Sequence, residues 1–405
     1  MTPDELQCSE EMPRDAFKSL MHRAIFDCFK WHIQHGDEAV LCPFPLVIDA
    51  GAWRGLAAAA EKLAREALQA EQEVLTRPDL QARLGLSRRL LWLLGMGSAP
   101  TPSGPRFSRF DFHPTDAGLR ITEGNIDVAG GIIESSGVTA LMASSYPALR
   151  PAGDPAGALA AALHRCSGPD GRVGLMHLTR YTEDRQIMLY LERRLAERGA
   201  STCLFDPAQL RFRRGHAEAL IHTGRTALDV VCRFFPAEWL ERLPAATRWV
   251  RAIVGGRTPF SNPGSAALTQ SKRFPLVWDD LKTPLATWRA LLPETRSPDE
   301  VTWEGDDEWV IKPALGHEGD RVGIAGVTPP ERYEEIAREA SRHPRDWVAQ
   351  RRFSATPLHT PLGLRYPSIG VFVLDGQAVG AYGRLARQPL IDDSAQEAVV
   401  LLTRS

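Results

Sequence analysis

A strand–helix–strand succession between residues 173 and 205 is the feature that most narrows the possible folds of this chain. Two short apolar runs flank a segment in which Ile187, Leu191 and Leu195 recur on one helical face, and Gly199 stands where that helix would end. Strands that alternate with amphipathic helices indicate an α/β fold. The unit is Rossmann-like in shape, but the chain lacks the GxGxxG pattern of dinucleotide-binding proteins.

The first hundred residues are predicted to be mostly helical. Apolar residues recur at three- and four-residue steps across 52–75, which is the pattern of one buried face of a long helix. They are Leu56, Ala60, Leu63, Ala67, Ala70 and Val74. The Gly-, Ser- and Pro-rich residues 95–105 then indicate a connector.

Two hairpins and one further strand are predicted outside the strand–helix–strand unit. Residues 107–112 and 119–123 flank a turn-rich segment, and a later pair of strands flanks Asp375-Gly376, a strong hairpin signal. The further strand ends at Lys312, and strand alternation would turn its neighbours Trp309 and Ile311 to the other side.

Composition argues against several classes of function. The chain has 48 basic and 50 acidic residues, so its net charge of -2 gives no general attraction to nucleic acid or to an anionic membrane. No apolar run approaches the roughly 18 residues of a membrane span, and the N-terminus lacks the pattern of a secretory signal. The six cysteines form no CxxC pair, which argues against a zinc site or a disulfide framework. We therefore expect a cytoplasmic protein with reduced thiols.

Oxygen-bearing side chains gather in the first predicted hairpin. Asp111, Glu123 and Asn125 supply two carboxylates and a carboxamide, the hard ligands that Mg²⁺ prefers. Arg109 beside them could neutralise a phosphoryl group during transfer. Ordinary polar residues on an exposed hairpin give the same pattern, and Asp111 shares a face with Glu123 only in one pairing register.

Lysine is rare in this chain, since only six of the 48 basic residues are lysine. A lysine retained among so many arginines can mark a position that needs a compact ammonium group. Lys312 precedes the glycine-bearing residues 316–323, and such a pair can hold a phosphate group. A surface lysine before Pro313 is the alternative, because no Walker GxxxxGK[ST] pattern occurs.

Several short segments follow one another in a characteristic order. They are Arg109-Phe110-Asp111, Glu123-x-Asn125-x-Asp127, Arg233 with Pro236-Ala237-Glu238-Trp239-Leu240, Ser271-Lys272, Trp309-Val310-Ile311-Lys312-Pro313, Gly316-x-x-Gly319, Trp347-Val348-Ala349-Gln350, Ser368-Ile369-Gly370 and Gly383-Arg384. Together they resemble the synthetase half of glutathionylspermidine synthase, a circularly permuted ATP-grasp family. The similarity begins near Cys42 and covers most of the chain. The carboxylates precede the lysines here, whereas most ATP-grasp enzymes have the reverse order.

This resemblance implies an ATP-dependent ligase that joins a small-molecule or peptide carboxylate to an amine. It assigns two Mg²⁺ ions to Asp111, Glu123 and Asn125, and an acyl phosphate to Arg109 and Arg384. The ATP contacts that it implies are Lys272, Lys312, Gly316, Gly319 and Gln350. It also divides the chain into a helical region (1–105), a metal-binding hairpin part (106–168), a Rossmann-like subdomain (169–250) and an ATP-binding part (251–405).

Four positions depart from the family pattern. Gly124 replaces a usual aromatic residue, His317 a usual arginine and Arg351 a usual acid, and Leu385 follows Arg384. These departures leave the acid and the amine open, and they motivate an alternative function as a catalytically reduced scaffold that binds a nucleotide or a peptide. Cys28 could be a thiol nucleophile, but its helical surroundings favour a packed side chain. No pattern indicates an oligomeric state.

Overall fold

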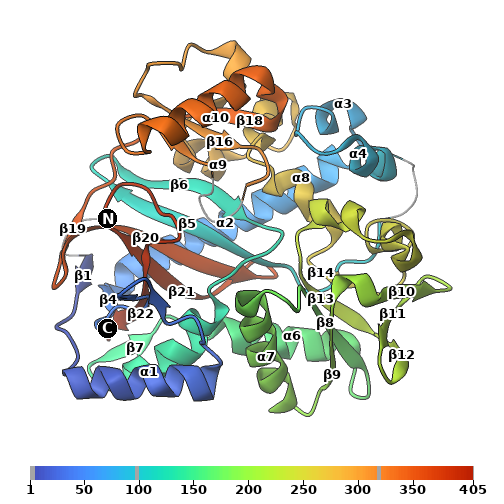
Figure 1. Cartoon of the computed structure of the whole chain (residues 1–405), viewed down its shortest axis with the longest axis horizontal. Helices are drawn as coiled ribbons and strands as arrows, with labels where there is room; N and C mark the ends of the chain where they lie inside the picture. Colours follow the sequence, from blue (N-terminus) through green and yellow to red (C-terminus); the bar gives the residue numbers. More distant parts are fainter. Residues whose placement is uncertain (1–4, 96–99, 317–320, 405) are drawn as a thin grey trace.

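The central layer of the protein is a nine-stranded sheet assembled from distant parts of the chain (Figure 1). The computed structural model describes residues 5–95, 100–316 and 321–404. The strand order is β1-β4-β22-β21-β20-β5-β6, with β19 beside β20 and β7 beside β22. These strands are β1 (Leu6–Cys8), β4 (Leu46–Ile48), β5 (Phe107–Thr115), β6 (Gly118–Asn125), β7 (Leu149–Pro151), β19 (Leu358–Thr360), β20 (Gly363–Leu374), β21 (Gln377–Ala386) and β22 (Gln396–Thr403).

The two predicted hairpins form the middle of this sheet. β5 pairs with β6, and β20 pairs with β21 across Asp375 and Gly376. Both turn residues have positive φ, at 49° and 82°, as the favoured two-residue hairpin turn requires. β20 also pairs with β5, which sets Gly370 opposite Asp111. The first and last thirds of the chain therefore meet at these strands.

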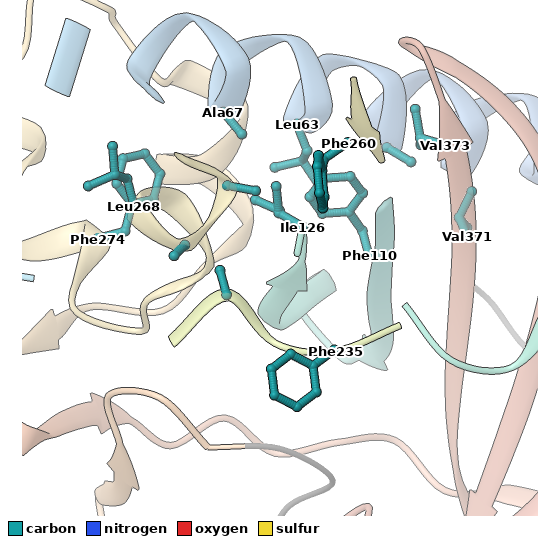
Figure 2. Close-up of a cluster of buried hydrophobic side chains, with 14 of the residues drawn as sticks. Leu63, Ala67, Phe110, Ile126, Phe235, Phe260, Leu268, Phe274, Val371 and Val373 are labelled. Atoms are coloured by element: carbon teal, nitrogen blue, oxygen red, sulfur yellow. The ribbon is translucent and has the colours of Figure 1, made fainter. Parts of the chain in front are cut away.

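One face of the sheet is covered by the predicted long helix, α2 (Ala50–Val74). The Asp49 carboxylate begins this helix by accepting hydrogen bonds from two amides of its first turn. Its apolar stripe packs on β5, β20 and β21, and Figure 2 shows Leu63 and Ala67 in the same cluster as Phe110. Burying a side chain such as Phe110 stabilises the fold by roughly 1.5–3 kcal/mol.

The opposite face of the same strands carries polar side chains. Because side chains alternate along a strand, the inward position of Phe110 and Phe112 turns Arg109, Asp111 and His113 away from α2. All three polar residues are nevertheless buried. This face therefore borders another part of the protein rather than open solvent.

A second, parallel sheet corresponds to the Rossmann-like unit, in the order β14-β13-β8-β9. The helix predicted around Ile187 is present as α7, and Gly199 has a φ of 75°. The elements are α6 (Pro155–Ser167), β8 (Arg172–His177), α7 (Thr182–Ala196), β9 (Ser201–Phe205), β13 (Val230–Phe234) and β14 (Phe260–Ser261). A small antiparallel meander lies beyond it, formed by β10 (Leu210–Arg213), β11 (His216–Ile221) and β12 (Gly224–Ala227).

A third sheet lies near the top of Figure 1, in the order β15-β18-β16-β17. Its strands are β15 (Thr295–Arg296), β16 (Trp309–Pro313), β17 (Gly323–Ile324) and β18 (Trp347–Arg351), and α10 (Pro330–Arg342) packs on one side. Trp309 and Ile311 form a buried cluster with Ile336 of α10. Lys312 projects to the other side, as strand alternation predicted.

The remaining elements are short apart from α1, and they connect the layers. The helices are α1 (Arg14–Cys28), α3 (Pro78–Gln81), α4 (Arg88–Gly95), α5 (Thr139–Ala143), α8 (Ala267–Gln270) and α9 (Ala286–Leu291), and two further strands are β2 (Gln34–His35) and β3 (Glu38–Ala39). The 3₁₀ and π turns are η1 (Glu134–Val138), η2 (Pro207–Gln209), η3 (Ala237–Arg242), η4 (Ala245–Thr247), η5 (Trp249–Ala252), η6 (Gly264–Ala266), η7 (Phe274–Asp280), η8 (Pro298–Glu300) and η9 (Pro344–Asp346). In the described ranges, no helix has the length and apolar character needed to cross a bilayer.

Candidate functional site

A cavity of about 740 Å³ lies against the polar face of the central sheet. Its wall combines β5, β6 and β21 of that sheet with β16 and β18 of the third sheet and the start of α7. Eight of the predicted site residues line it, namely Arg109, Asp111, Glu123, Asn125, Lys272, Lys312, Gln350 and Arg384. The fold thus brings together side chains that lie up to 275 positions apart in the sequence.

A β-bulge sets the relative facing of the two predicted carboxylates. Phe110 pairs with Gly124, whereas Phe112 pairs with Ile121, so β6 has one extra residue opposite Asp111. Gly124 and Ile121 both face α2, which leaves Glu123 on the cavity side of the strand. The condition for Asp111 and Glu123 to share a face is therefore met by an irregularity of the strand.

Asp111 is held by two neighbours on the same face. Arg109 binds both oxygens of this carboxylate, with N–O distances of 2.7 and 2.8 Å, and Asn125 Nδ2 donates to it at 3.1 Å. Burial opposes ionisation, but Arg109 outweighs that effect and lowers the pKa of Asp111 below its ordinary value. Since Asn125 donates through its nitrogen, its carbonyl oxygen is left to face another group.

Glu123 meets a lysine from a distant segment. Lys272 Nζ lies 2.7 Å from a Glu123 oxygen and donates at 2.7 Å to the carbonyl oxygen of Gly316. Burial would raise the pKa of Glu123, but Lys272 and Lys312 lower it further than burial raises it. The ammonium of Lys272 therefore links a predicted metal ligand to the start of the glycine-bearing segment. Gly319 lies outside the described residues.

Lys312 is buried and donates to Gln350 Oε1 at 2.6 Å. Burial lowers the pKa of the ammonium to about 8, although Glu123 acts in the opposite direction. Lys272 contributes a further lowering through charge repulsion. Lys312 therefore holds its proton less firmly than an exposed lysine does, while it remains an ammonium group at neutral pH.

Arg384 projects into the cavity from β21 and is only partly buried. It lies opposite Glu397 and Ser368 in the strand pairing, and its charge acts on Asp111. In the parts of the chain that the structure describes, its guanidinium has no hydrogen-bond or ion-pair partner. A free guanidinium in a cavity is suited to bind a carboxylate or phosphate group.

Comparisons with known proteins show the family of the chain. Residues 21–399 match the model of the glutathionylspermidine synthase preATP-grasp family. The chain belongs to this family. The predicted circularly permuted ATP-grasp fold is therefore confirmed, and with it a place among ATP-grasp-like ligases.

One solved structure shows the same fold at low sequence identity, and a second matches more weakly. A glutathione synthetase-like effector from Globodera pallida, in its apo form, matches with a TM-score of 0.65 at 12% identity, over 97% of this chain and 98% of that one. A Methylobacillus flagellatus protein named for γ-glutamylcysteine synthetase matches with a TM-score of 0.39 at 12% identity, over 78% of this chain and 83% of that one. No curated protein matches the sequence.

Two departures from the family pattern have a structural explanation. A Cβ atom on Gly124 would lie 2.9 Å from atoms of both Phe110 and Trp288, so these rings already fill the space of the usual aromatic residue. Arg351 lies over the ring of Trp309 at 4.2 Å and pairs with Glu294. Leu385 is buried in the main core, whereas His317 lies outside the described residues.

The predicted donor set of Asp111, Glu123 and Asn125 has the chemistry that suits Mg²⁺. Two carboxylates and a carboxamide oxygen supply hard ligands and leave other positions to water and phosphate. Within residues 5–95, 100–316 and 321–404, no three His, Cys, Asp or Glu side chains are grouped as metal ligands. The proposed set has two acids, Asp111 and Glu123, and its third member is Asn125.

The family signature also contains Asp127, an acid whose partners differ from those of Asp111 and Glu123. Asp127 forms a buried ion pair with Arg233 and accepts a hydrogen bond from the amide of Ala237 at 2.7 Å. Asn262 and Gln270 bind the backbone of the same segment. Asp127 therefore anchors the end of β6, next to Asn125, to the Rossmann-like unit.

Sequence reasoning missed a charged cluster at the edge of the cavity. Lys30 Nζ lies 2.5 Å from Glu134 and 2.8 Å from Glu397, and all three residues line the cavity. Burial and the neighbouring Glu134 raise the pKa of Glu397 to about 7 against the effect of Lys30. The rarity of lysine could have drawn attention to Lys30. Cys28 beside it is a packed thiol, as predicted.

Proposed function

We propose that this protein is an ATP- and Mg²⁺-dependent ligase that joins a carboxylate to an amine through an acyl phosphate. One observation carries the proposal: the hard oxygen ligands of the β5–β6 hairpin and two lysines from distant segments line a single cavity. Family membership supports the same reaction class. The substrates are a small-molecule or peptide acid and an amine.

Each half of the cavity has a task in the proposal. Lys272 and Lys312 bind the phosphates of ATP, and Gln350 lies near the base. Bound Mg²⁺, two ions in the proposed complex, would neutralise phosphate charge during transfer. Arg109 holds Asp111 in place, while the free guanidinium of Arg384 binds the acid and then its acyl phosphate.

The reaction needs no nucleophile from the protein. A carboxylate oxygen of the substrate attacks the γ-phosphorus, and ADP leaves. The amine then attacks the acyl carbon, inorganic phosphate leaves, and the nitrogen gives up a proton. Water competes with the amine, so the cavity must align the two substrates and limit access by water.

Nucleotide entry must rearrange the charge pairs of the free protein. Lys272 neutralises Glu123 in the absence of ligand, at a distance of 2.7 Å. In the proposed complex, Glu123 would bind a metal ion and Lys272 a phosphate oxygen. Both charges remain paired after the exchange, so neither is left buried without a partner.

ADP release with pools of carboxylates and amines tests the proposal. The wild-type protein should release ADP only when ATP, Mg²⁺, an acid and an amine are all present, and mass spectrometry should detect an amide. Lys312→Ala and Asp111→Asn should lower the rate at least a hundredfold, because each removes charge stabilisation of the transferring group. Lys62→Ala, on the exposed side of α2, is the matched control and should keep the rate.

The alternative is a catalytically reduced scaffold that binds a nucleotide without turnover. Such a protein would be stabilised against heat by ATP, because a ligand that binds the folded state raises its apparent stability. It would release no ADP with any acid and amine. Stabilisation without ADP release across broad pools would therefore replace the ligase proposal with this function.

A further inference from the structure

A chain of three hydrogen bonds leads from Lys312 into the third sheet. The Lys312 ammonium donates to Gln350 Oε1 at 2.6 Å, and Gln350 Nε2 donates to Thr295 Oγ1 at 3.1 Å. The Thr295 hydroxyl in turn donates to the carbonyl oxygen of Pro293 at 3.0 Å. The side chains of Lys312, Gln350 and Thr295 are all buried.

The two ends of this chain fix the direction of every proton in it. An ammonium group can only donate, and a peptide carbonyl can only accept. The single hydroxyl proton of Thr295 is used by the carbonyl of Pro293, so Thr295 can only accept from Gln350. Gln350 must then turn its nitrogen toward Thr295 and its oxygen toward Lys312. The reversed carboxamide would set an N–H group against the ammonium.

Strand pairing places the three residues on one face of the third sheet. Gln350 of β18 lies opposite Thr295 of β15 on one side and opposite Val310 of β16 on the other. Lys312 follows Val310 by two residues and therefore projects to the same face. Besides these hydrogen bonds, the charges of Glu123 and Lys272 act on the Lys312 ammonium.

We propose that Thr295 is a positioning residue for Lys312 and acts through the carboxamide of Gln350. This role rests on the proposed function, in which Lys312 binds an ATP phosphate. With the hydroxyl present, the ammonium is held in place before the nucleotide arrives, so less conformational freedom is lost on binding. Without it, the carboxamide is free to rotate and the ammonium loses its acceptor.

ATP binding by Thr295 variants tests this role. Thr295→Val keeps the shape but lacks the hydroxyl. It should weaken ATP binding by roughly tenfold, as expected when the charged Lys312 loses its hydrogen bond to Gln350. Thr295→Ser keeps the hydroxyl and should restore the affinity to within about threefold of wild type. Thr269→Val is the matched control, because the buried Thr269 hydroxyl has no hydrogen-bond partner among the described residues.

A double-mutant cycle separates positioning from packing. Gln350→Glu offers an oxygen acceptor to Lys312 in either orientation, so Thr295→Val should change ATP affinity by less than about threefold in that background. Where Thr295→Val folds poorly on its own, Thr295→Ala takes its place in the cycle, and an equal loss of ATP affinity in the wild-type and Gln350→Glu backgrounds would overturn the role. Calorimetry measures the affinities, and thermal unfolding without ligand reports folding.

The outcomes distinguish this inference from the proposed function. Wild-type protein that fails to bind ATP would overturn both. Wild-type protein that binds ATP, together with a Thr295→Val variant of equal affinity, would overturn only the positioning role. Equal losses in Thr295→Val and Thr295→Ser would also overturn it, because packing and not the hydroxyl would then be responsible.

Discussion

At the scale of single residues, the proposed activity depends on charges that are buried or partly buried before any ligand is present. Lys312, Glu123 and Asp111 each rely on one or two neighbours for compensation. A buried charge without a partner is strongly destabilised, so these side chains must change partners together when a nucleotide binds. A change in the protonation of such a group should therefore change the affinity for ATP.

ATP affinity should fall as the pH rises through about 8. Burial lowers the pKa of Lys312 to about 8, so the ammonium is charged below that pH and becomes neutral above it. Glu123 and Lys272 are the other charges that act on it. Calorimetry at pH 7 and pH 9.5 should show a loss of roughly tenfold. The Lys312→Arg variant stays charged and should show a much flatter profile; an identical profile in both proteins would count against this assignment.

The rings of Phe110 and Trp288 fill the space beside Gly124, which explains why this chain does not need the usual aromatic residue at that position. Gly124→Ala should destabilise the fold by roughly 1–3 kcal/mol, because the added Cβ would lie 2.9 Å from the rings of Phe110 and Trp288. Urea unfolding measures the change. Gly55→Ala is the control, since nothing lies within 4 Å of the added atom on α2, and it should stabilise by about 0.5–1 kcal/mol. A neutral Gly124→Ala would show that the rings can move aside.

At the scale of elements, strand pairing and helix packing place the candidate site with little help from loops. β5 and β20 pair across more than 250 residues of sequence, and α2 covers their apolar face. The polar face is left to the cavity, whose lining includes Lys30 from the segment after α1. This N-terminal segment is attached at Glu397, whose backbone bonds to Val40 and Cys42.

Lys30→Met should destabilise the protein by roughly 3–5 kcal/mol at pH 8, since it leaves the buried Glu134 and the partly buried Glu397 without their shared cation. Burial and Glu134 raise the pKa of Glu397 from 4.5 to about 7. Ionisation of this group therefore lowers the free energy of unfolding of the wild-type protein as the pH rises from 4.5 to about 7. The variant should therefore be much less impaired at pH 5 than at pH 8. Denaturant unfolding at both pH values tests this, with Lys18→Met on the exposed side of α1 as the control. A loss that does not depend on pH would contradict it.

At the scale of the whole molecule, local sequence patterns predicted the helices and strands well. They did not predict the irregular pairing of strands or the contacts between distant residues. The period of α2 and the turn at Asp375 predicted a helix and a hairpin that are both present. The bulge opposite Asp111 was not predictable, because one extra residue in a strand leaves the apolar alternation nearly unchanged. Lys30 was missed since its partner Glu397 lies 367 residues away, and single-sequence patterns carry no information on such pairs.

Permutation of the chain has a direct structural consequence for the whole molecule. The oxygen ligands come from the first third of the sequence and the lysines from the last, yet pairing of β5 with β20 and the walls of one cavity unite them. The proposed ligase requires that this cavity hold one nucleotide across both parts. The carboxylates and the lysines would otherwise belong to unrelated surfaces.

A crystal structure of the wild-type protein with Mg²⁺ and a non-hydrolysable ATP analogue tests this requirement most directly. We expect Lys272 and Lys312 within hydrogen-bond distance of phosphate oxygens, and Asp111, Glu123 and Asn125 on Mg²⁺ bound to the same triphosphate. A nucleotide bound elsewhere, or a triphosphate that the lysines contact while the oxygen ligands of β5 and β6 remain paired with Arg109 and Lys272, would contradict the account.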